Sequence, residues 1–225
     1  MEWPLAGGLH APQFSTVDAN GDGLQDLYIF DRLDYRQLLF IQAPSNEGIT
    51  YTYAPAWAKH FPDMENWVLL EDYNGDGISD IFTSRVNPDE DVSGVLVYNG
   101  YYDQDSIKFS LVSINGTIAY TSEEETNPLP IFVDALAYPA IGDMDCDGDL
   151  DILAFDLNGG SLKMYCNQSF ELGFDLDSLI FSLCNPCWGG FFESPISPTV
   201  ELATAADICA STGGLLPPPH MGVSL

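Results

Sequence analysis

The chain has few positive charges and no long apolar run. Its 225 residues include 6 Lys and Arg against 34 Asp and Glu, which gives a formal net charge of −28. This balance excludes nucleic acid as a partner, because binding it requires cations that neutralise phosphates. No apolar stretch reaches the length of about 18 residues that a membrane span needs, so we expect no membrane insertion. The first residues, MEWPLAGG, lack the basic and apolar regions of a signal peptide.

Cysteine is scarce and its count is odd. The 5 cysteines are compatible with a secreted chain that has one or two disulfides and one free thiol. Cys184 and Cys187 form a CNPC motif at the end of a predicted strand, whereas a redox CxxC opens a helix. A zinc site would need two more ligands nearby. We therefore expect structural disulfides, for instance between Cys187 and Cys209.

The chain is rich in apolar residues and contains a repeated acidic stretch. Hydrophobic residues make up 46% and aromatic residues 12%, which is enough for a packed core. The stretches DANGDGLQD, DYNGDGISD and DMDCDGDLD occupy residues 18–26, 72–80 and 143–151. They begin 54 and then 71 residues apart, and the longer interval contains the acidic, proline-containing segment 121–130. Three such stretches in one chain require a common cause.

Segments rich in β-branched and aromatic residues flank each acidic stretch. Short apolar segments precede the stretches at 14–17, 67–70 and 137–141. The segments that follow are 27–31, 38–42 and 49–55; then 81–85, 94–99 and 107–113; and finally 152–156, 161–167 and 179–185. Turn-forming residues separate them. The predicted unit is strand, acidic loop, strand, turn, strand, turn, strand. A helical period occurs only around 54–64.

Oxygen-bearing side chains recur at positions 1, 3, 5 and 9 of each stretch, and glycine recurs at position 6. In a tight loop such oxygens converge, and position 7 offers its backbone carbonyl. The predicted side-chain ligands are Asp18, Asn20, Asp22 and Asp26; Asp72, Asn74, Asp76 and Asp80; and Asp143, Asp145, Asp147 and Asp151. The predicted carbonyl ligands are those of Leu24, Ile78 and Asp149. We expect about three Ca²⁺ ions, because Mg²⁺ requires stricter octahedral geometry.

Two other interpretations of the acidic stretches fit the sequence less well. An EF-hand requires a glutamate at position 12 and flanking helices, but position 12 here is Ile29, Thr83 or Ala154, inside predicted strands. Three metal-free Asx turns would explain the Asn, Asp and Gly residues. They would not explain why the ninth position is acidic every time.

The pattern DxNGDGxxD followed by an apolar strand resembles the calcium-binding loops of FG-GAP/VCBS repeats. Those repeats form the blades of integrin-α-type β-propellers, which are abundant in secreted bacterial surface proteins. The resemblance covers about residues 9–190, in GGLHAPQFSTVDANGDGLQDLYIFDR, ENWVLLEDYNGDGISDIFTSR and YPAIGDMDCDGDLDILAFDLNGG. The Phe-Gly and Gly-Ala-Pro sequence motifs of the family are absent from this chain. The resemblance implies Ca²⁺ in blade hairpins, an extracellular or cell-surface location, and adhesion or binding of proteins or carbohydrates.

We therefore predict an all-β fold of four-stranded antiparallel β-propeller blades. Residues 1–200 would form three to four blades, and residues 201–225 an irregular tail. Because propellers typically close with about four to eight blades, this number predicts an incomplete ring. Further blades would come from the parent chain or another subunit, since open strand edges promote aggregation.

The predicted function is a calcium-binding adhesion or ligand-binding module, and not an enzyme. The histidines are scattered and no nucleophile motif accompanies them (His10, His60 and His220). Aromatic residues could stack on sugars, although such residues more often pack in cores (Trp57, Tyr101, Tyr102 and Trp188). Two alternatives stay open: the scaffold of a polysaccharide-degrading enzyme, and a purely structural spacer.

Overall fold

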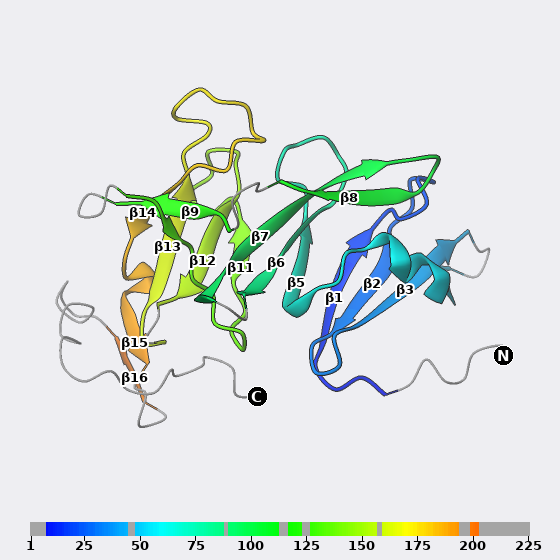
Figure 1. Cartoon of the computed structure of the whole chain (residues 1–225), viewed down its shortest axis with the longest axis horizontal. Coiled ribbons are helices and arrows are strands. Elements are labelled where there is room, and N and C mark those ends of the chain that lie inside the picture. The colour runs from blue at the N-terminus through cyan, green and yellow to red at the C-terminus, as the bar shows by residue number, and fades with distance from the viewer. Residues whose placement is uncertain are drawn as a thin grey trace. The chain divides into compact units, whose positions relative to one another are not determined.

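β-Strands dominate the fold, as the β-branched and aromatic segments predict. The computed structural model describes residues 8–44, 48–87, 90–112, 117–122, 127–156, 159–193 and 199–202. This part of the chain is all-β, with two short 3₁₀ helices, η1 (Pro55–His60) and η2 (Trp188–Gly190) (Figure 1). η1 lies inside the segment 54–64 that showed a helical period. Among the described residues, no helix combines the length and hydropathy that a bilayer crossing needs.

The first acidic loop connects the first two strands of a four-stranded antiparallel sheet. The sheet order is β1-β2-β3-β4. Its strands are β1 (Pro12–Val17), β2 (Asp26–Asp31), β3 (Arg36–Ala43) and β4 (Thr50–Tyr53). Val17 pairs with Asp26, so the loop leaves the sheet and returns to it at paired positions.

A second four-stranded sheet repeats this arrangement in the order β5-β6-β7-β8. Its strands are β5 (Glu65–Glu71), β6 (Asp80–Asn87), β7 (Glu90–Tyr102) and β8 (Ile107–Leu111). Glu71 pairs with Asp80 across the antiparallel β5–β6 hairpin, so the second acidic loop occupies the same place as the first.

The third acidic loop lies at the same place in a third sheet, which has six strands in the order β10-β9-β14-β13-β12-β11. The repeated part comprises β11 (Ala140–Gly142), β12 (Asp151–Phe155), β13 (Leu162–Asn167) and β14 (Phe181–Asn185). β9 (Ala119–Thr121) pairs in parallel with β14, and β10 (Leu129–Pro130) continues the sheet. These two strands include the two ends of the acidic segment 121–130, of which residues 123–126 lie outside the described residues. A separate hairpin pairs β15 (Phe191–Glu193) with β16 (Val200–Leu202).

The predicted unit of four antiparallel strands with the acidic loop after the first strand is therefore confirmed three times. Within the described residues, none of the sheets closes on itself. The addition of β9 and β10 was not expected, because neither strand belongs to the repeated pattern. The predicted tail 201–225 begins inside β16, and its residues from 203 onward lie outside the described residues.

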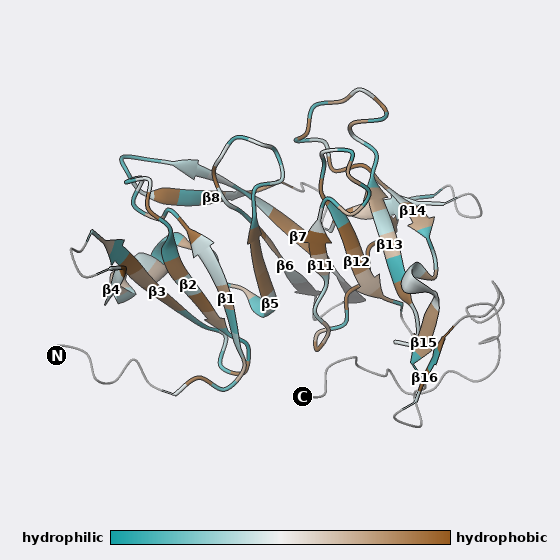
Figure 2. Cartoon of the chain, turned by 180° about the vertical axis from the view of Figure 1, so that it is seen from behind, coloured by the Kyte–Doolittle hydropathy of each residue, from teal (hydrophilic) through white to brown (hydrophobic). Residues whose placement is uncertain are grey.

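The chain divides into two compact units, each with its own apolar core. One unit contains residues 1–85 and 96–116, and the other contains residues 86–95 and 117–225. The first core packs side chains of both four-stranded sheets, including Val17, Tyr28, Phe30, Leu39, Val68, Ile81 and Ile107. A cluster in the second unit contains Leu153, Met164 and Cys166. In Figure 2 hydrophobic colouring runs through strands such as β5 and β12, and the loops between strands mix hydrophilic and hydrophobic residues.

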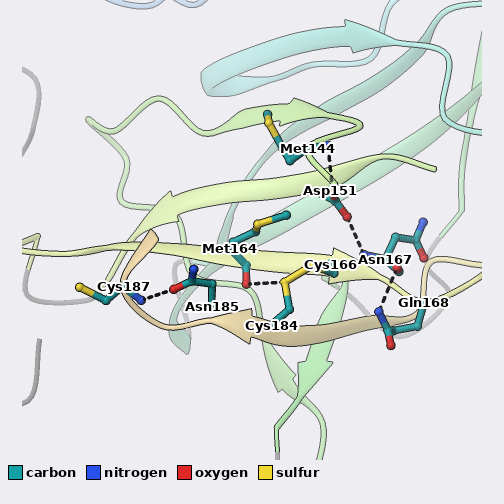
Figure 3. Close-up of a disulfide and its surroundings, with 9 residues drawn as sticks. All are labelled: Met144, Asp151, Met164, Cys166, Asn167, Gln168, Cys184, Asn185 and Cys187. Atoms are coloured by element: carbon teal, nitrogen blue, oxygen red, sulfur yellow. Dashed lines mark hydrogen bonds between the residues drawn. A yellow bond between two sulfur atoms is a disulfide. The ribbon is translucent and has the colours of Figure 1, made fainter. Parts of the chain in front are cut away.

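A disulfide joins two neighbouring strands of the third sheet. Cys166 of β13 is bonded to Cys184 of β14 (Figure 3). Cys187 is also disulfide-bonded, and Cys209, its expected partner, lies outside the described residues. Cys146 is a free, exposed thiol. Because Cys184 bonds to Cys166, the CNPC motif is not a redox pair or a zinc site, and the prediction of structural disulfides is confirmed.

Candidate metal centre

Left-handed backbone conformations shape the three acidic loops. Position 6 has a positive φ of 81°, 83° and 106° at Gly23, Gly77 and Gly148. Position 4 has a positive φ as well, of 70°, 74° and 68° at Gly21, Gly75 and Cys146. Glycine adopts these φ values with little steric cost, whereas a residue with a Cβ atom does not. The third loop therefore holds a strained residue, Cys146, where the other two loops have glycine.

Carboxylates at positions 1 and 5 accept hydrogen bonds from the loop backbone. Asp18 Oδ2 accepts the Gly23 N–H over 2.8 Å, and Asp72 Oδ2 accepts the Gly77 N–H over 2.9 Å. The N–H at position 7 donates to the carboxylate at position 5 over 2.8, 2.8 and 3.1 Å, from Leu24 to Asp22, Ile78 to Asp76 and Asp149 to Asp147. These bonds fix the carboxylates in the turn and leave acceptor capacity, because a carboxylate can accept about four bonds.

Position 3 carries an amide in the first two loops. Asn20 Nδ2 donates to Asp22 Oδ2 over 2.9 Å, and Asn74 Nδ2 donates to Asp76 Oδ2 over 3.3 Å. The side-chain oxygens Asn20 Oδ1 and Asn74 Oδ1 accept the backbone N–H at position 5. Each amide thus offsets part of the repulsion between the carboxylates of its loop.

The third loop brings three carboxylates together without such an amide. Asp143, Asp145 and Asp147 each offer an oxygen within 4.8 Å of the others. Asp147 Oδ2 is buried and has no hydrogen-bond partner in the described part of the chain, which costs free energy unless a donor or a cation meets it. An all-oxygen set of this kind could hold a hard cation. Among the described residues, the aspartates of the first two loops form no group of three this close.

The aspartate at position 9 is fully buried in all three loops and holds the loop to the third strand. Asp26, Asp80 and Asp151 are each 0% exposed. One oxygen accepts the N–H at position 2 over 3.0, 3.1 and 3.0 Å, from Ala19, Tyr73 and Met144. The other accepts an N–H of the third strand over 2.7, 2.7 and 3.0 Å, from Gln42, Gly100 and Asn167. Figure 3 shows this arrangement around Asp151.

The acidity of position 9 therefore has a structural reason. Two backbone donors hold each of these aspartates, so their acidity does not by itself require a metal ion. The pKa values nevertheless show that the negative charge is incompletely compensated. Burial raises the pKa of Asp80 and of Asp151 to about 6, although hydrogen bonds from backbone amides lower it, and neighbouring loop aspartates raise it further. Burial likewise raises the pKa of Asp26.

Residues outside the acidic stretches position the loops, and the sequence did not single out this role. Tyr102 Oη donates to the Asp18 carbonyl over 2.7 Å, and the Ile107 N–H donates to the Ala19 carbonyl over 3.0 Å. Gly100, which donates to Asp80, lies so close to the second loop that a Cβ atom would meet the Ser79 carbonyl oxygen at 2.3 Å. Gly100 lies inside β7, and a glycine inside a strand is a signal for such a close approach.

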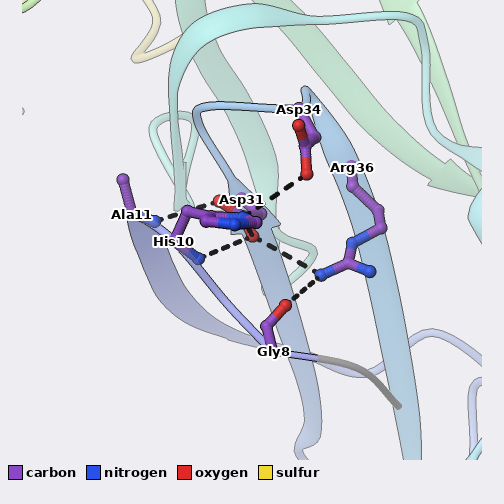
Figure 4. A network of polar contacts seen from close by, with 6 residues as sticks. All are labelled: Gly8, His10, Ala11, Asp31, Asp34 and Arg36. Atoms are coloured by element: carbon purple, nitrogen blue, oxygen red, sulfur yellow. Dashed lines mark hydrogen bonds and ion pairs between the residues drawn. The ribbon is translucent and has the colours of Figure 1, made fainter. Parts of the chain in front are cut away.

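Two further groups of potential ligands are already engaged in bonds within the protein. Asp145, Asp151 and Cys166 lie close together, but the Cys166 sulfur is in a disulfide and cannot act as a thiolate ligand. His10, Asp31 and Asp34 form a second group (Figure 4). The buried Asp31 carboxylate accepts the N–H groups of His10 and Ala11, each over 3.0 Å, and lies 3.5 Å from Arg36.

The group around Asp31 therefore already contains a cation. Burial favours a higher pKa for the Asp31 carboxyl, but hydrogen bonds from the backbone N–H groups of Ala11, His10 and Leu33 lower it below its usual value. Arg36 also donates to the Gly8 carbonyl over 2.7 Å. These contacts join the segment before β1 to strands β2 and β3, which gives the group a structural role.

No family model, curated protein or solved structure matches the chain. The candidate centre is therefore defined by its own geometry. The loops at 18–26 and 72–80 belong to the first unit, and the loop at 143–151 belongs to the second.

The four aromatic residues that could stack on sugars differ in their exposure. Trp57 packs against the first core, whereas Tyr101, Tyr102 and Trp188 are 43%, 38% and 37% exposed.

Proposed function

We propose that the three acidic loops bind Ca²⁺ and that the chain is a calcium-stabilised segment of a β-propeller of the FG-GAP/VCBS type. The observation that carries this proposal is the repetition of one loop, with one hydrogen-bond pattern, after the first strand of three separate sheets. Backbone donors account for the aspartate at position 9, whereas the carboxylates at positions 1 and 5 keep acceptor capacity that an ion can use. In each loop the proposed ligands are the oxygens at positions 1, 3, 5 and 9 and the carbonyl at position 7.

The charge and chemistry of the loops favour Ca²⁺ among the common cations. The first loop has three aspartates among its proposed ligands (Asp18, Asp22 and Asp26), the second has three and the third has four, so the empty sets carry −3, −3 and −4. Each bound ion cancels two of these charges. Zn²⁺ would favour His or Cys ligands, and Ca²⁺ tolerates irregular cages of about six to eight oxygens.

The proposed biological role is an extracellular adhesion or ligand-binding module. The Cys166–Cys184 disulfide supports an oxidising compartment, because such bonds are rare in the cytosol. The open four-stranded sheets support propeller blades completed by further blades of the parent protein or of another subunit, since exposed edges otherwise promote aggregation. The ligand would be a protein or a carbohydrate.

Calorimetric titration of chelator-stripped protein with Ca²⁺ tests the metal proposal. Asp18→Ala, Asp72→Ala and Asp143→Ala should each remove one ion from the binding stoichiometry. Asp63→Ala, an exposed carboxylate outside the loops, should remove none. Circular dichroism would confirm that each variant stays folded. Equal stoichiometry in all four variants and the wild type would refute the loop sites.

Glycan and protein arrays, probed with Ca²⁺ and again with EDTA, test the proposed role. A ligand bound only in the presence of Ca²⁺ would support a binding module. Turnover of a glycan that is abolished by one carboxylate substitution outside the loops would instead make the protein an enzyme. Arrays without any ligand would favour a structural spacer.

A further inference from the structure

The third loop differs from the other two at position 7. Leu24 and Ile78 occupy this position in the first two loops, whereas the third loop has Asp149. The Asp149 residue is only 1% exposed, although an ionised carboxylate is costly to bury. Its Oδ2 accepts the Phe170 N–H over 3.2 Å. Its Oδ1 is buried and has no hydrogen-bond partner among the described residues.

The Asp149 carboxylate belongs to a group of three carboxylates that two segments bring together. Asp147, Asp149 and Glu171 each offer an oxygen within 4.8 Å of the others. Asp147 and Asp149 come from the acidic loop, and Glu171 comes from the connection between β13 and β14. Asp147 Oδ2 is a second buried oxygen without a hydrogen-bond partner in the part of the chain that the structure describes. Asp147 and Glu171 are also within side-chain hydrogen-bond reach of each other, which requires a shared proton or a cation between the two carboxyl groups.

We propose that Asp147, Asp149 and Glu171 bind a divalent cation, Ca²⁺ by the chemistry of the ligands, at a site separate from the one formed by the repeated loop pattern. The site uses the side chain of Asp149, whereas the loop pattern uses only its carbonyl. The first two loops cannot form it, because Leu24 and Ile78 provide no side-chain oxygen. Asp147 belongs to both ligand sets and would bridge the two ions.

The position of this site gives it a defined structural effect. The ion would connect the third acidic loop to the β13–β14 connection through Glu171. Phe170, whose backbone N–H already donates to Asp149, is adjacent to this ligand and is 61% exposed. Ion binding would therefore add a second link between the loop and the connection that carries this exposed aromatic residue.

Native mass spectrometry of the full chain, titrated with Ca²⁺ alone, tests the proposal by counting ions. We expect the wild type to bind four ions and Glu171→Gln to bind three. Asp149→Leu reproduces the residue found in the first loop and keeps the backbone carbonyl, so it should also bind three. Asp175→Asn, in the same connection, should still bind four. Glu171 is exposed, so its substitution should leave the fold intact.

The outcomes separate this site from the loop sites proposed above. Three ions in the wild type and in both variants would overturn the additional site, with the carboxyl groups then sharing protons, and would leave the loop proposal standing. One wild-type ion that Glu171→Gln removes and Asp72→Ala retains would establish the additional site and refute the loop sites. A wild type that binds no ion would overturn both.

Discussion

At the scale of single residues, the loops contain carboxylates of two kinds. The aspartate at position 9 is buried and holds two backbone amides, so it has a structural role even without an ion. The carboxylates at positions 1 and 5, and the side chain at position 3, are more exposed and are bound mainly within the loop. Under the proposed Ca²⁺ binding, substitutions should separate the two roles, because only the backbone-holding role of position 9 is independent of the ion.

The Asp80→Ala and Asp76→Ala variants should therefore differ in their free energy of unfolding in EDTA. Asp80→Ala leaves the Tyr73 and Gly100 N–H groups without their acceptor, and charged hydrogen bonds contribute about 1.5–3 kcal/mol each. We expect a loss of about 3 kcal/mol in the free energy of unfolding in EDTA. Asp76 is exposed, so Asp76→Ala should cost less than about 1 kcal/mol in EDTA. Urea titrations with and without Ca²⁺ measure both, and equal losses in EDTA would refute this division.

The raised pKa values of Asp80 and Asp151 predict a specific pH dependence of the ion-free protein. Both values are about 6 in the folded state, above the ordinary value of 3.8. The folded state then binds more protons than the unfolded state between about pH 4 and pH 6, so stability falls as the pH rises through this window. Urea titrations in EDTA should show this fall, and Asp80→Asn should reduce its slope. If stability fell with pH as steeply in Asp80→Asn as in the wild type, the assignment of this pH dependence to Asp80 would be contradicted.

At the scale of elements, each acidic loop depends on strands that lie outside it. The first loop is held by Tyr102 Oη, at the end of β7, and by the Ile107 N–H at the start of β8. The second is held by Gly100 of β7. The geometry of a loop is therefore fixed by its sheet and by the neighbouring hairpin, and not by its nine residues alone.

Tyr102→Phe should weaken calcium binding by the first loop. The substitution removes one hydrogen bond to the Asp18 carbonyl, of about 1 kcal/mol, which corresponds to about a fivefold change in affinity. Tyr101→Phe, at the neighbouring exposed position, is the matched control and should have no effect. Calorimetric titration measures both variants, and equal affinities would show that the tyrosine hydroxyl does not support the loop.

The sequence could predict the strands, but not the contacts that hold the loops. The alternation of β-forming segments with turn residues was sufficient to place the twelve strands of the three repeated units. The donors to Asp26, Asp80 and Asp151 could not be predicted, because they are backbone N–H groups that almost any residue supplies. The pairing of Cys166 with Cys184 stayed open because spacing does not determine connectivity. The buried side chain of Asp149 was missed because the loop pattern uses only its carbonyl.

At the scale of the whole molecule, a net charge of −28 opposes a compact state. The acidic loops concentrate part of this charge, two of them in the first unit and one in the second. Ion binding should therefore stabilise both units.

Thermal unfolding of the wild type in Ca²⁺ and in EDTA tests the central claim most directly. An ion at a free concentration one hundred times its Kd stabilises the folded state by about 2.7 kcal/mol. One kcal/mol shifts the Tm of a chain of this size by about 2–4 °C. We therefore predict that EDTA lowers the Tm by about 5–10 °C or more, and that added Ca²⁺ restores it while Mg²⁺ restores it only in part. An identical Tm in Ca²⁺ and in EDTA would contradict the account.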